Sequence, residues 1–155
     1  EIKTYNSQDF KNINLKDYML DHDEQMMNVV DLPKGIKFET SVDENLELSI
    51  EVITPLLLII DEITINAIKH AFPDKTSPNN KITKTVRCIG NNTAEMIIKD
   101  NGVGIKDSSD INQNLGCEII KSLTKQLGGK ISLITQETGT AYKLVFPIEM
   151  EHTIE

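Results

Sequence analysis

Residues 54–73, TPLLLIIDEITINAIKHAFP, are the stretch that decides the fold. The run is long and apolar enough for a buried helix, with Pro55 acceptable near a helix start and Pro73 ending it. Four polar side chains interrupt the second half at spacings i, i+4, i+7 and i+8, namely Glu62, Asn66, Lys69 and His70. These spacings place all four on one face of the helix.

A polar stripe of this kind is usually the solvated side of a half-exposed helix. This stripe is narrow, since Asp61 is almost the only other charge in the helix, and Asn66 is a poor helix-interior residue. An Asn carbonyl oxygen suits Mg2+, and a neighbouring carboxylate such as Glu62 can take a proton or orient water. The stripe therefore predicts a helix face that lies over a metal–phosphate group.

Two further segments carry candidate binding residues. Asp100-Asn101-Gly102-Val103-Gly104 follows an apolar strand pattern and reads either as a tight turn or as a pocket wall where Asp100 accepts a hydrogen bond from an exocyclic amine. Asn114–Cys117 precede a helix pattern and read equally as a flexible helix start or as an anion site. A dinucleotide fingerprint is excluded, because Asp107 stands where its third glycine is required.

Hydrophobic periodicity divides the rest of the chain into helices and strand pairs. A first helix starts at Asn14, where Asp17 completes a carboxylate variant of the capping box. The other elements are expected as strands at 36–42 and 46–50 that form a hairpin, a helix at 54–72, strands at 82–89 and 94–100 joined through 90–92, a helix at 115–127, and strands at 130–136 and 140–146. This order predicts a two-layer α+β sandwich, with a mixed, mostly antiparallel sheet covered on one face by three main helices.

Length and charge bound the function. The 155 residues suit one domain, expected at 14–148 between a linker at 1–13 and a tail at 149–155. The net charge of −8 disfavours binding to nucleic acid or direct contact with an anionic membrane, and no apolar run is long enough to span a bilayer. Cys88 and Cys117 form no C-x-x-C pair and are expected as free buried thiols in a reducing, cytoplasmic compartment.

These motifs resemble those of a known family. Residues 61–73 resemble the N box of sensor histidine kinases, residues 100–104 their first glycine box, and Asn114–Cys117 a shortened second one. The resemblance covers about residues 14–148, and the KHAFP ending at 69–73 is similar to the subgroup with a short nucleotide lid. The superfamily also contains chaperone, topoisomerase and mismatch-repair ATPases and anti-sigma-factor kinases.

The resemblance implies a Bergerat-type fold that binds ATP and Mg2+. By this similarity Asn66 would coordinate Mg2+, Glu62 would assist proton removal from the phospho-accepting imidazole, and Asp100 would bind the adenine amine. The other residues implied to contact ATP are Lys69, His70, Gly102, Gly104, Leu115 and Gly116. The second glycine box departs from the family, since only Gly116 is present and the 11 residues at 105–115 contain no phenylalanine.

The resemblance also implies partners. The γ-phosphate of ATP would pass to a histidine on a separate helical dimerisation domain and then to a response regulator, with a homodimer formed only through that domain. None of His22, His70 and His152 has the surroundings of an acceptor, and His22 is expected to be an ordinary exposed helix residue. Because the chain starts at Glu1 without a methionine, the acceptor is expected upstream, in a parent protein that could be membrane-anchored. The alternatives are an anti-sigma-type protein-serine kinase and a non-catalytic nucleotide-binding module.

Overall fold

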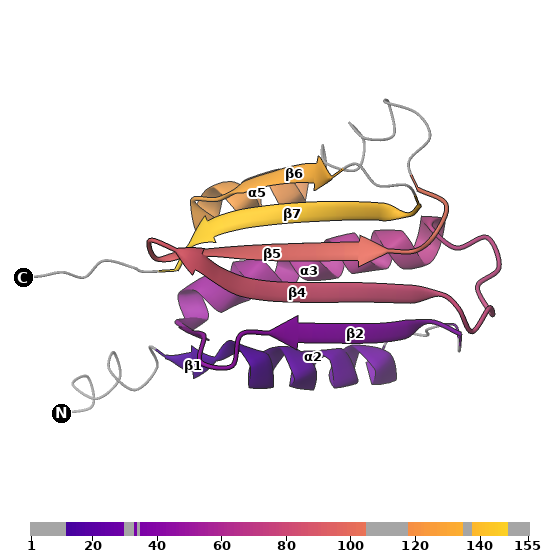
Figure 1. Cartoon of the computed structure of the whole chain (residues 1–155), viewed down its shortest axis with the longest axis horizontal. Helices are drawn as coiled ribbons and strands as arrows, with labels where there is room; N and C mark the ends of the chain where they lie inside the picture. Colours follow the sequence, from indigo (N-terminus) through magenta and orange to yellow (C-terminus); the bar gives the residue numbers. More distant parts are fainter. Residues whose placement is uncertain (1–11, 30–32, 34, 105–117, 135–137, 149–155) are drawn as a thin grey trace, which may run out of the picture.

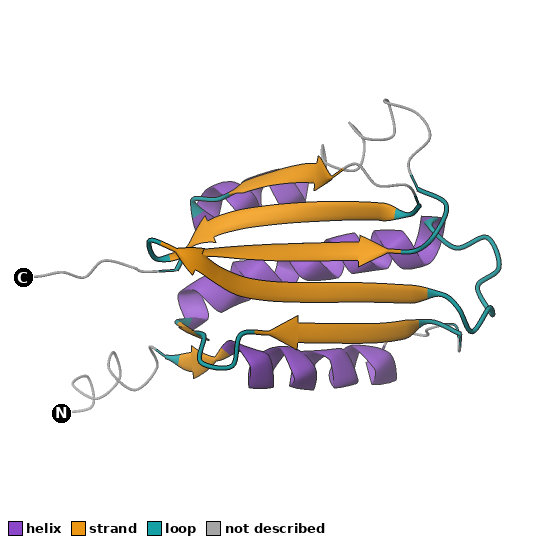
Figure 2. Cartoon of the chain, viewed as in Figure 1, coloured by secondary structure: helices purple, strands orange, loops and turns teal. Residues whose placement is uncertain are grey.

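A computed structural model describes residues 12–29, 33, 35–104, 118–134 and 138–148. In this part of the chain a five-stranded sheet forms one layer and the helices form the other (Figures 1 and 2). The elements are β1 (Ile13–Asn14), α2 (Leu15–Val29), β2 (Lys37–Val42), β3 (Glu47–Leu48), α3 (Ile50–His70), β4 (Lys81–Gly90), β5 (Thr93–Asp100), α5 (Glu118–Leu127), β6 (Lys130–Ile134) and β7 (Thr140–Pro147).

The sheet has the strand order β2-β4-β5-β7-β6. Only β2 and β4 run parallel, and the other three neighbouring pairs are antiparallel. The short strands β1 and β3 pair separately. The prediction of a mixed, mostly antiparallel sheet with helices on one face is therefore confirmed.

The prediction that the strands at 36–42 and 46–50 form a hairpin is wrong. Strand β2 pairs with β4 in the register Lys37↔Lys81, whereas β3 pairs with β1 in the register Ile13↔Leu48. Parallel neighbours need a long crossover, and α3 supplies it here. An alternating pattern shows that a segment is a strand but not which strand it pairs with. Ile13, which the predicted linker includes, lies in β1.

Helix α3 starts four residues earlier than predicted. Ser49 is its N-cap residue in extended backbone, and Ile50, assigned from the sequence to a strand, is its first residue. Val52 and Ile53 are buried in the core, so their burial extends the helix toward its N-terminus. Pro55 consequently lies inside the helix rather than at its start.

The other element boundaries follow the sequence pattern closely. The N–H group of Asp17 donates to Asn14 Oδ1 at 3.0 Å, which confirms the predicted cap of α2. The β4–β5 turn contains Asn91 and Asn92, both with positive φ, as a tight hairpin turn requires. Residues 115–117 and 135–136, predicted to belong to the last helix and to a strand, lie outside the described residues.

The core lies between the sheet and the helices. Its centre consists of inward-facing strand residues and the buried side of α3, including Ile82, Met96, Ile98, Leu144, Phe146, Ile53, Leu56, Ile59 and Ile60. Cys88 is exposed, because it follows the last buried residue of β4, so the prediction of a buried thiol there is wrong. Cys117 lies outside the described residues. No helix in the described ranges is long and apolar enough to cross a bilayer.

Candidate functional site

A pocket lies between α3, α5 and the adjoining ends of β5 and β7. Four residues singled out from the sequence line it: Asn66, His70, Asp100 and Gly104. The other lining residues are Ile63, Ala67, Ala71, Ile120, Thr140 and Tyr142. The structure therefore brings the N-box residues Asn66 and His70 together with the first glycine box, which follows them by 30 residues or more.

The second half of α3 supplies one wall of the pocket. Ile63, Thr64 and Ile68 are buried, so they fix which side of the helix faces the core. Asn66 is half-buried on the pocket side, and Glu62 is half-buried one turn before it. Neither Glu62 nor Lys69 lines the pocket, and Lys69 is exposed. The predicted stripe thus has two members in the pocket wall, and two beside it.

Asp100 is the buried acceptor of the site. It is 8% exposed, and its Oδ1 accepts hydrogen bonds from the N–H groups of Gly102 at 2.9 Å and Thr140 at 3.3 Å. Desolvation by burial raises the pKa of Asp100, and these two N–H groups partly oppose the rise. Both of these bonds use Oδ1, and Asp100 lines the pocket.

The glycines of the Asp100–Gly104 segment serve the packing of the chain itself. A Cβ on Gly102 would lie 2.2 Å from the carbonyl oxygen of Ala71, the residue that caps α3. The N–H group of Val103 donates to this same oxygen at 2.9 Å. Gly104 has a φ of +81°, and a Cβ there would lie 2.9 Å from the Gly139 oxygen. Glycine is therefore required at both positions for the close approach of backbone segments around the pocket, whether or not a ligand is bound.

Several lining residues carried no individual signal in the sequence. Thr140 acts through its backbone N–H group, and Ile120 and Tyr142 belong to ordinary amphipathic patterns. Leu115 and Gly116, predicted to close on phosphates, lie outside the described residues.

The described residues include no group of three or more His, Cys, Asp or Glu side chains that could hold a metal ion. Asn66 is part of the pocket wall, and the carbonyl oxygen of an Asn side chain suits Mg2+ as one ligand among several. A Mg2+ ion at this site would have to be held largely by the oxygens of a bound ligand and by water. The donor set therefore fits an ion that arrives with a phosphate ligand.

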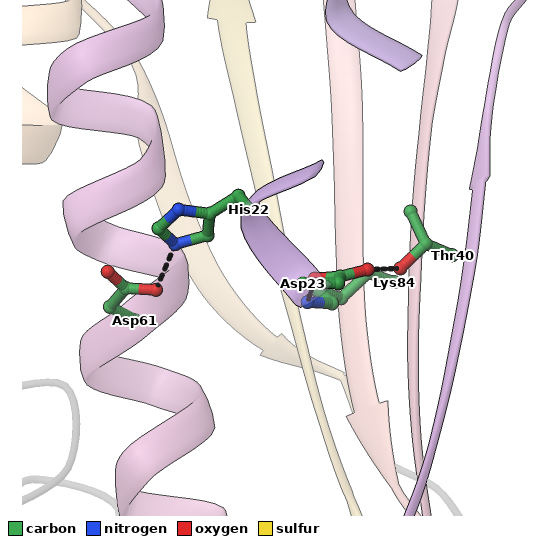
Figure 3. A network of polar contacts seen from close by, with 5 residues as sticks. All are labelled: His22, Asp23, Thr40, Asp61 and Lys84. Carbon is green, nitrogen blue, oxygen red and sulfur yellow. Dashed lines mark hydrogen bonds and ion pairs between the residues drawn. The ribbon is translucent and has the colours of Figure 1, made fainter. Parts of the chain in front are cut away.

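The prediction that His22 is an ordinary exposed helix residue is wrong. Its side chain is 24% exposed, and its Nε2 lies 2.8 Å from Oδ1 of Asp61 (Figure 3). Asp61 directly precedes Glu62 on α3. The chain pattern alone could not show this contact, because the two residues lie 39 positions apart.

Comparison with known proteins places this pocket in a family. The family model described as histidine kinase-, DNA gyrase B-, and HSP90-like ATPase matches residues 51–150, which include α3 and the whole described pocket. The Blue-light-activated histidine kinase 2 of Erythrobacter litoralis (strain HTCC2594) is 25% identical over 130 residues. The match covers 83% of this chain, but the chain spans only 37% of that relative's length.

Solved structures give the same result. The histidine kinase domain of the blue-light activated histidine kinase from Erythrobacter litoralis EL346 is 25% identical and superposes with a TM-score of 0.71, covering 88% of this chain and 62% of that one. The Acinetobacter baumannii histidine kinase AdeS, 14% identical, shares the fold with a TM-score of 0.67 over 90% of this chain and 68% of that one. The chain belongs to the histidine kinase-, DNA gyrase B- and HSP90-like ATPase family, and it is an ATP-binding domain of the kind found in histidine kinases.

Proposed function

We propose that this chain is the catalytic domain of a sensor histidine kinase and directs the γ-phosphoryl group of ATP to a histidine on a separate helical domain. The observation that supports this most strongly is the arrangement of Asn66 and Asp100. Both line one pocket, Asn66 from α3 and Asp100 from the end of β5, with Glu62 one helical turn from Asn66. A recognition group for the base and a ligand for the phosphate end thus share one pocket.

Asp100 binds the adenine end of ATP in this proposal. Its Oδ2 accepts a hydrogen bond from the exocyclic amine of adenine, while the two backbone N–H groups hold Oδ1. Ile63, Ala67 and Ile120 supply an apolar lining suited to a planar base. Burial of the carboxylate strengthens this single contact, because water competes poorly for a desolvated acceptor.

Asn66 and its neighbours on α3 serve the phosphate end. The Asn66 carbonyl oxygen is a ligand for Mg2+, which, when bound, neutralises the charge that develops on the phosphates. Lys69 and His70 contact the nucleotide from the last turn of the helix, and Gly102 and Gly104 shape the pocket. The proposal also assigns phosphate contacts to Leu115 and Gly116, which lie outside the described residues.

Glu62 acts as the catalytic base. It is half-buried, and it lies on the stripe that leads along α3 toward the pocket. From this position its carboxylate takes a proton from the acceptor imidazole as the histidine nitrogen attacks the γ-phosphorus and the bond to the bridging oxygen of ADP breaks. The chain's main contribution is to position ATP and to stabilise charge, as in other phosphoryl transfers.

The partners follow from this chemistry. His22 is bonded to Asp61 and His70 lies in the ATP pocket, so neither is the acceptor. The acceptor histidine belongs to a helical dimerisation domain, which passes the phosphoryl group to a response regulator. Such a relay operates in the cytoplasm, where ATP is available.

The nucleotide part of the proposal is tested by thermal unfolding of the chain with and without Mg-ATP. At 100 times its dissociation constant a ligand adds about 2.7 kcal/mol, which raises the Tm of a domain of this size by about 5–10 °C. Asn66→Ala should reduce the Mg2+-dependent part of the shift. An unchanged wild-type Tm at saturating Mg-ATP would contradict the proposal.

The chemistry is tested by transfer of labelled phosphate from [γ-32P]ATP to the helical acceptor domain. Phosphohistidine is lost in acid and survives base, whereas phosphoserine survives acid. An acid-stable product would instead favour a protein-serine kinase of the anti-sigma type. ATP binding without transfer, together with unchanged signalling in Asn66→Ala, would favour a non-catalytic module.

A further inference from the structure

Two adjacent residues of α2, His22 and Asp23, point in different directions into the molecule. Successive residues of a helix are separated by about 100° around its axis, so neighbours can serve two different surfaces. Asp23 reaches the sheet and His22 reaches α3 (Figure 3). The two side chains together attach α2 to both layers of the domain.

Asp23 makes two hydrogen bonds, and the one with Lys84 is buried. Its Oδ1 accepts a hydrogen bond from Lys84 Nζ, and its Oδ2 accepts one from Thr40 Oγ1 at 2.5 Å. Thr40 and Lys84 are direct partners in the β2–β4 register, so one carboxylate bridges two strands. The Lys84 side chain is 1% exposed, and its ammonium also lies 5.1 Å from the centre of the Phe38 ring. This cluster fixes the α2 backbone next to His22.

The contact made by His22 is directional. Asp61 as a carboxylate can only accept a hydrogen bond, so the proton between the two groups is on Nε2 of His22. Both side chains are about one-quarter exposed, which leaves the bond only partly screened by water. Because Asp23 is already fixed by the buried cluster, His22 is held in place and constrains Asp61.

This bond joins the two helices at a particular point. Helices α2 and α3 start at the same end of the sheet and diverge along their length (Figure 1). Among the described residues, no other side-chain hydrogen bond or ion pair connects them. The residue it holds on α3 directly precedes Glu62, and it lies before the pocket residue Asn66 by little more than one helical turn.

We propose that His22 is a positioning residue for phosphoryl transfer, which acts through Asp61 to hold the turn of α3 that carries Glu62. The proposal rests on the proposed function of Glu62. It assigns His22 an effect mainly on turnover, because the carboxylate proposed to recognise adenine belongs to another element. Asp100 is the last residue of β5, whereas the turn that His22 holds is part of α3.

The test is a kinetic comparison of wild type and His22→Ala in transfer from Mg-ATP to the helical acceptor domain. Loss of the bond should lower kcat by about tenfold, since small misplacements of catalytic groups have effects of this order or larger. The KM for ATP should stay within about twofold of wild type, because the base-recognising carboxylate of Asp100 is on β5 and not on α3.

Conservative variants separate positioning from folding. His22→Gln keeps an N–H donor at a similar reach, so it should recover most of the lost kcat. The double variant His22→Ala/Asp61→Ala should be no slower than the slower single variant, because both remove the same interaction. Lys16→Ala is the matched control on the same helix. Lys16 also pairs with a carboxylate, that of Glu44, but the Lys16 side chain is 37% exposed and the Glu44 side chain is 77% exposed. It should leave kcat unchanged.

The outcomes are distinguishable. If the wild-type protein transfers phosphate and His22→Ala has an unchanged kcat, or changes only the KM for ATP, the positioning role is overturned. The proposed function then remains intact. Failure of His22→Gln to recover activity while its Tm matches wild type would also overturn it. Absence of transfer by the wild-type protein would contradict the proposed function itself and with it this role.

Discussion

Asp23 and Asp100 are both buried acidic residues, and each is 8% exposed. Their surroundings differ. Asp23 faces the ammonium group of Lys84 and the hydroxyl of Thr40. Asp100 accepts hydrogen bonds from the backbone N–H groups of Gly102 and Thr140. The first carboxylate has a full counter-charge inside the protein, and the second has none among the described residues.

This difference separates a structural carboxylate from a binding one. A buried ion pair whose hydrogen bonds are satisfied needs both partners and has little capacity left for a ligand. A buried carboxylate without a cation has a raised pKa, at some cost in stability, and its oxygens are acceptors suited to a neutral N–H donor. Removing the Asp23 side chain should therefore mainly lower stability. Removing the Asp100 side chain should mainly weaken ATP binding.

Asp23→Ala should produce the largest loss of stability. The substitution leaves the Lys84 ammonium buried without its partner, which costs about 3–5 kcal/mol in the free energy of unfolding. Urea denaturation followed by circular dichroism measures the loss. The paired replacement Asp23→Leu/Lys84→Met removes both charges and should recover most of it. A loss below about 1 kcal/mol in Asp23→Ala would show that the cluster is not the anchor inferred here.

Asp100→Asn should have the next largest effect, on ATP binding. The Asn carbonyl oxygen would take over the bonds from Gly102 and Thr140, so its NH2 group would face the adenine amine as a second donor. An unsatisfied buried donor costs about 1–3 kcal/mol, equivalent to about a 5- to 150-fold weaker affinity for ATP. Isothermal titration calorimetry measures the change. Equal affinity in the variant and the wild type would exclude adenine recognition by Asp100.

The same variant should also change the dependence of stability on pH. Because burial raises the pKa of Asp100 in the folded state, protonation favours folding, and this contribution is lost as pH rises through the raised pKa. The stability of the wild type relative to Asp100→Asn should therefore decrease as pH is raised from about 4 to about 7. Urea denaturation at several pH values measures the difference. A constant difference would contradict the raised pKa.

Arg87→Ala should have the smallest effect. Arg87 pairs with Glu95 at 3.1 Å, but its side chain is 64% exposed. Exposed pairs contribute about 0–1 kcal/mol, so the loss on urea denaturation should be at most about one-third of that for Asp23→Ala. An effect as large as that of Asp23→Ala would show that burial does not determine the difference between the two ion pairs.

The pocket could largely be predicted from the sequence. Helical periodicity alone places Asn66 and His70 on one face, and the strand preceding Asp100 determines that this residue lies at a sheet end. These local patterns agree with the structure, because α3 and β5 are each continuous elements. That the two meet in one pocket followed only from the family resemblance.

The anchoring of α2 could not be predicted in the same way. The alternation Ile82, Lys84, Val86 places a lysine on the buried side of its strand, which signals that a partner exists. The partner, Asp23, lies 61 positions away on a helix whose charges otherwise suggest a solvated face. Pairings over such distances depend on the topology, and the parallel pairing of β2 with β4 is the part of the topology that the local patterns did not reveal.

That parallel pairing has a kinetic consequence. Helix α3 is the connection between β2 and β4, so the register Lys37↔Lys81 closes a loop that contains Asn66 and Glu62. Closing a long loop loses chain entropy before its contacts form, which makes such pairings slow steps in folding. We therefore expect β2 to join the sheet late in folding, after the local antiparallel pairing of β4 with β5.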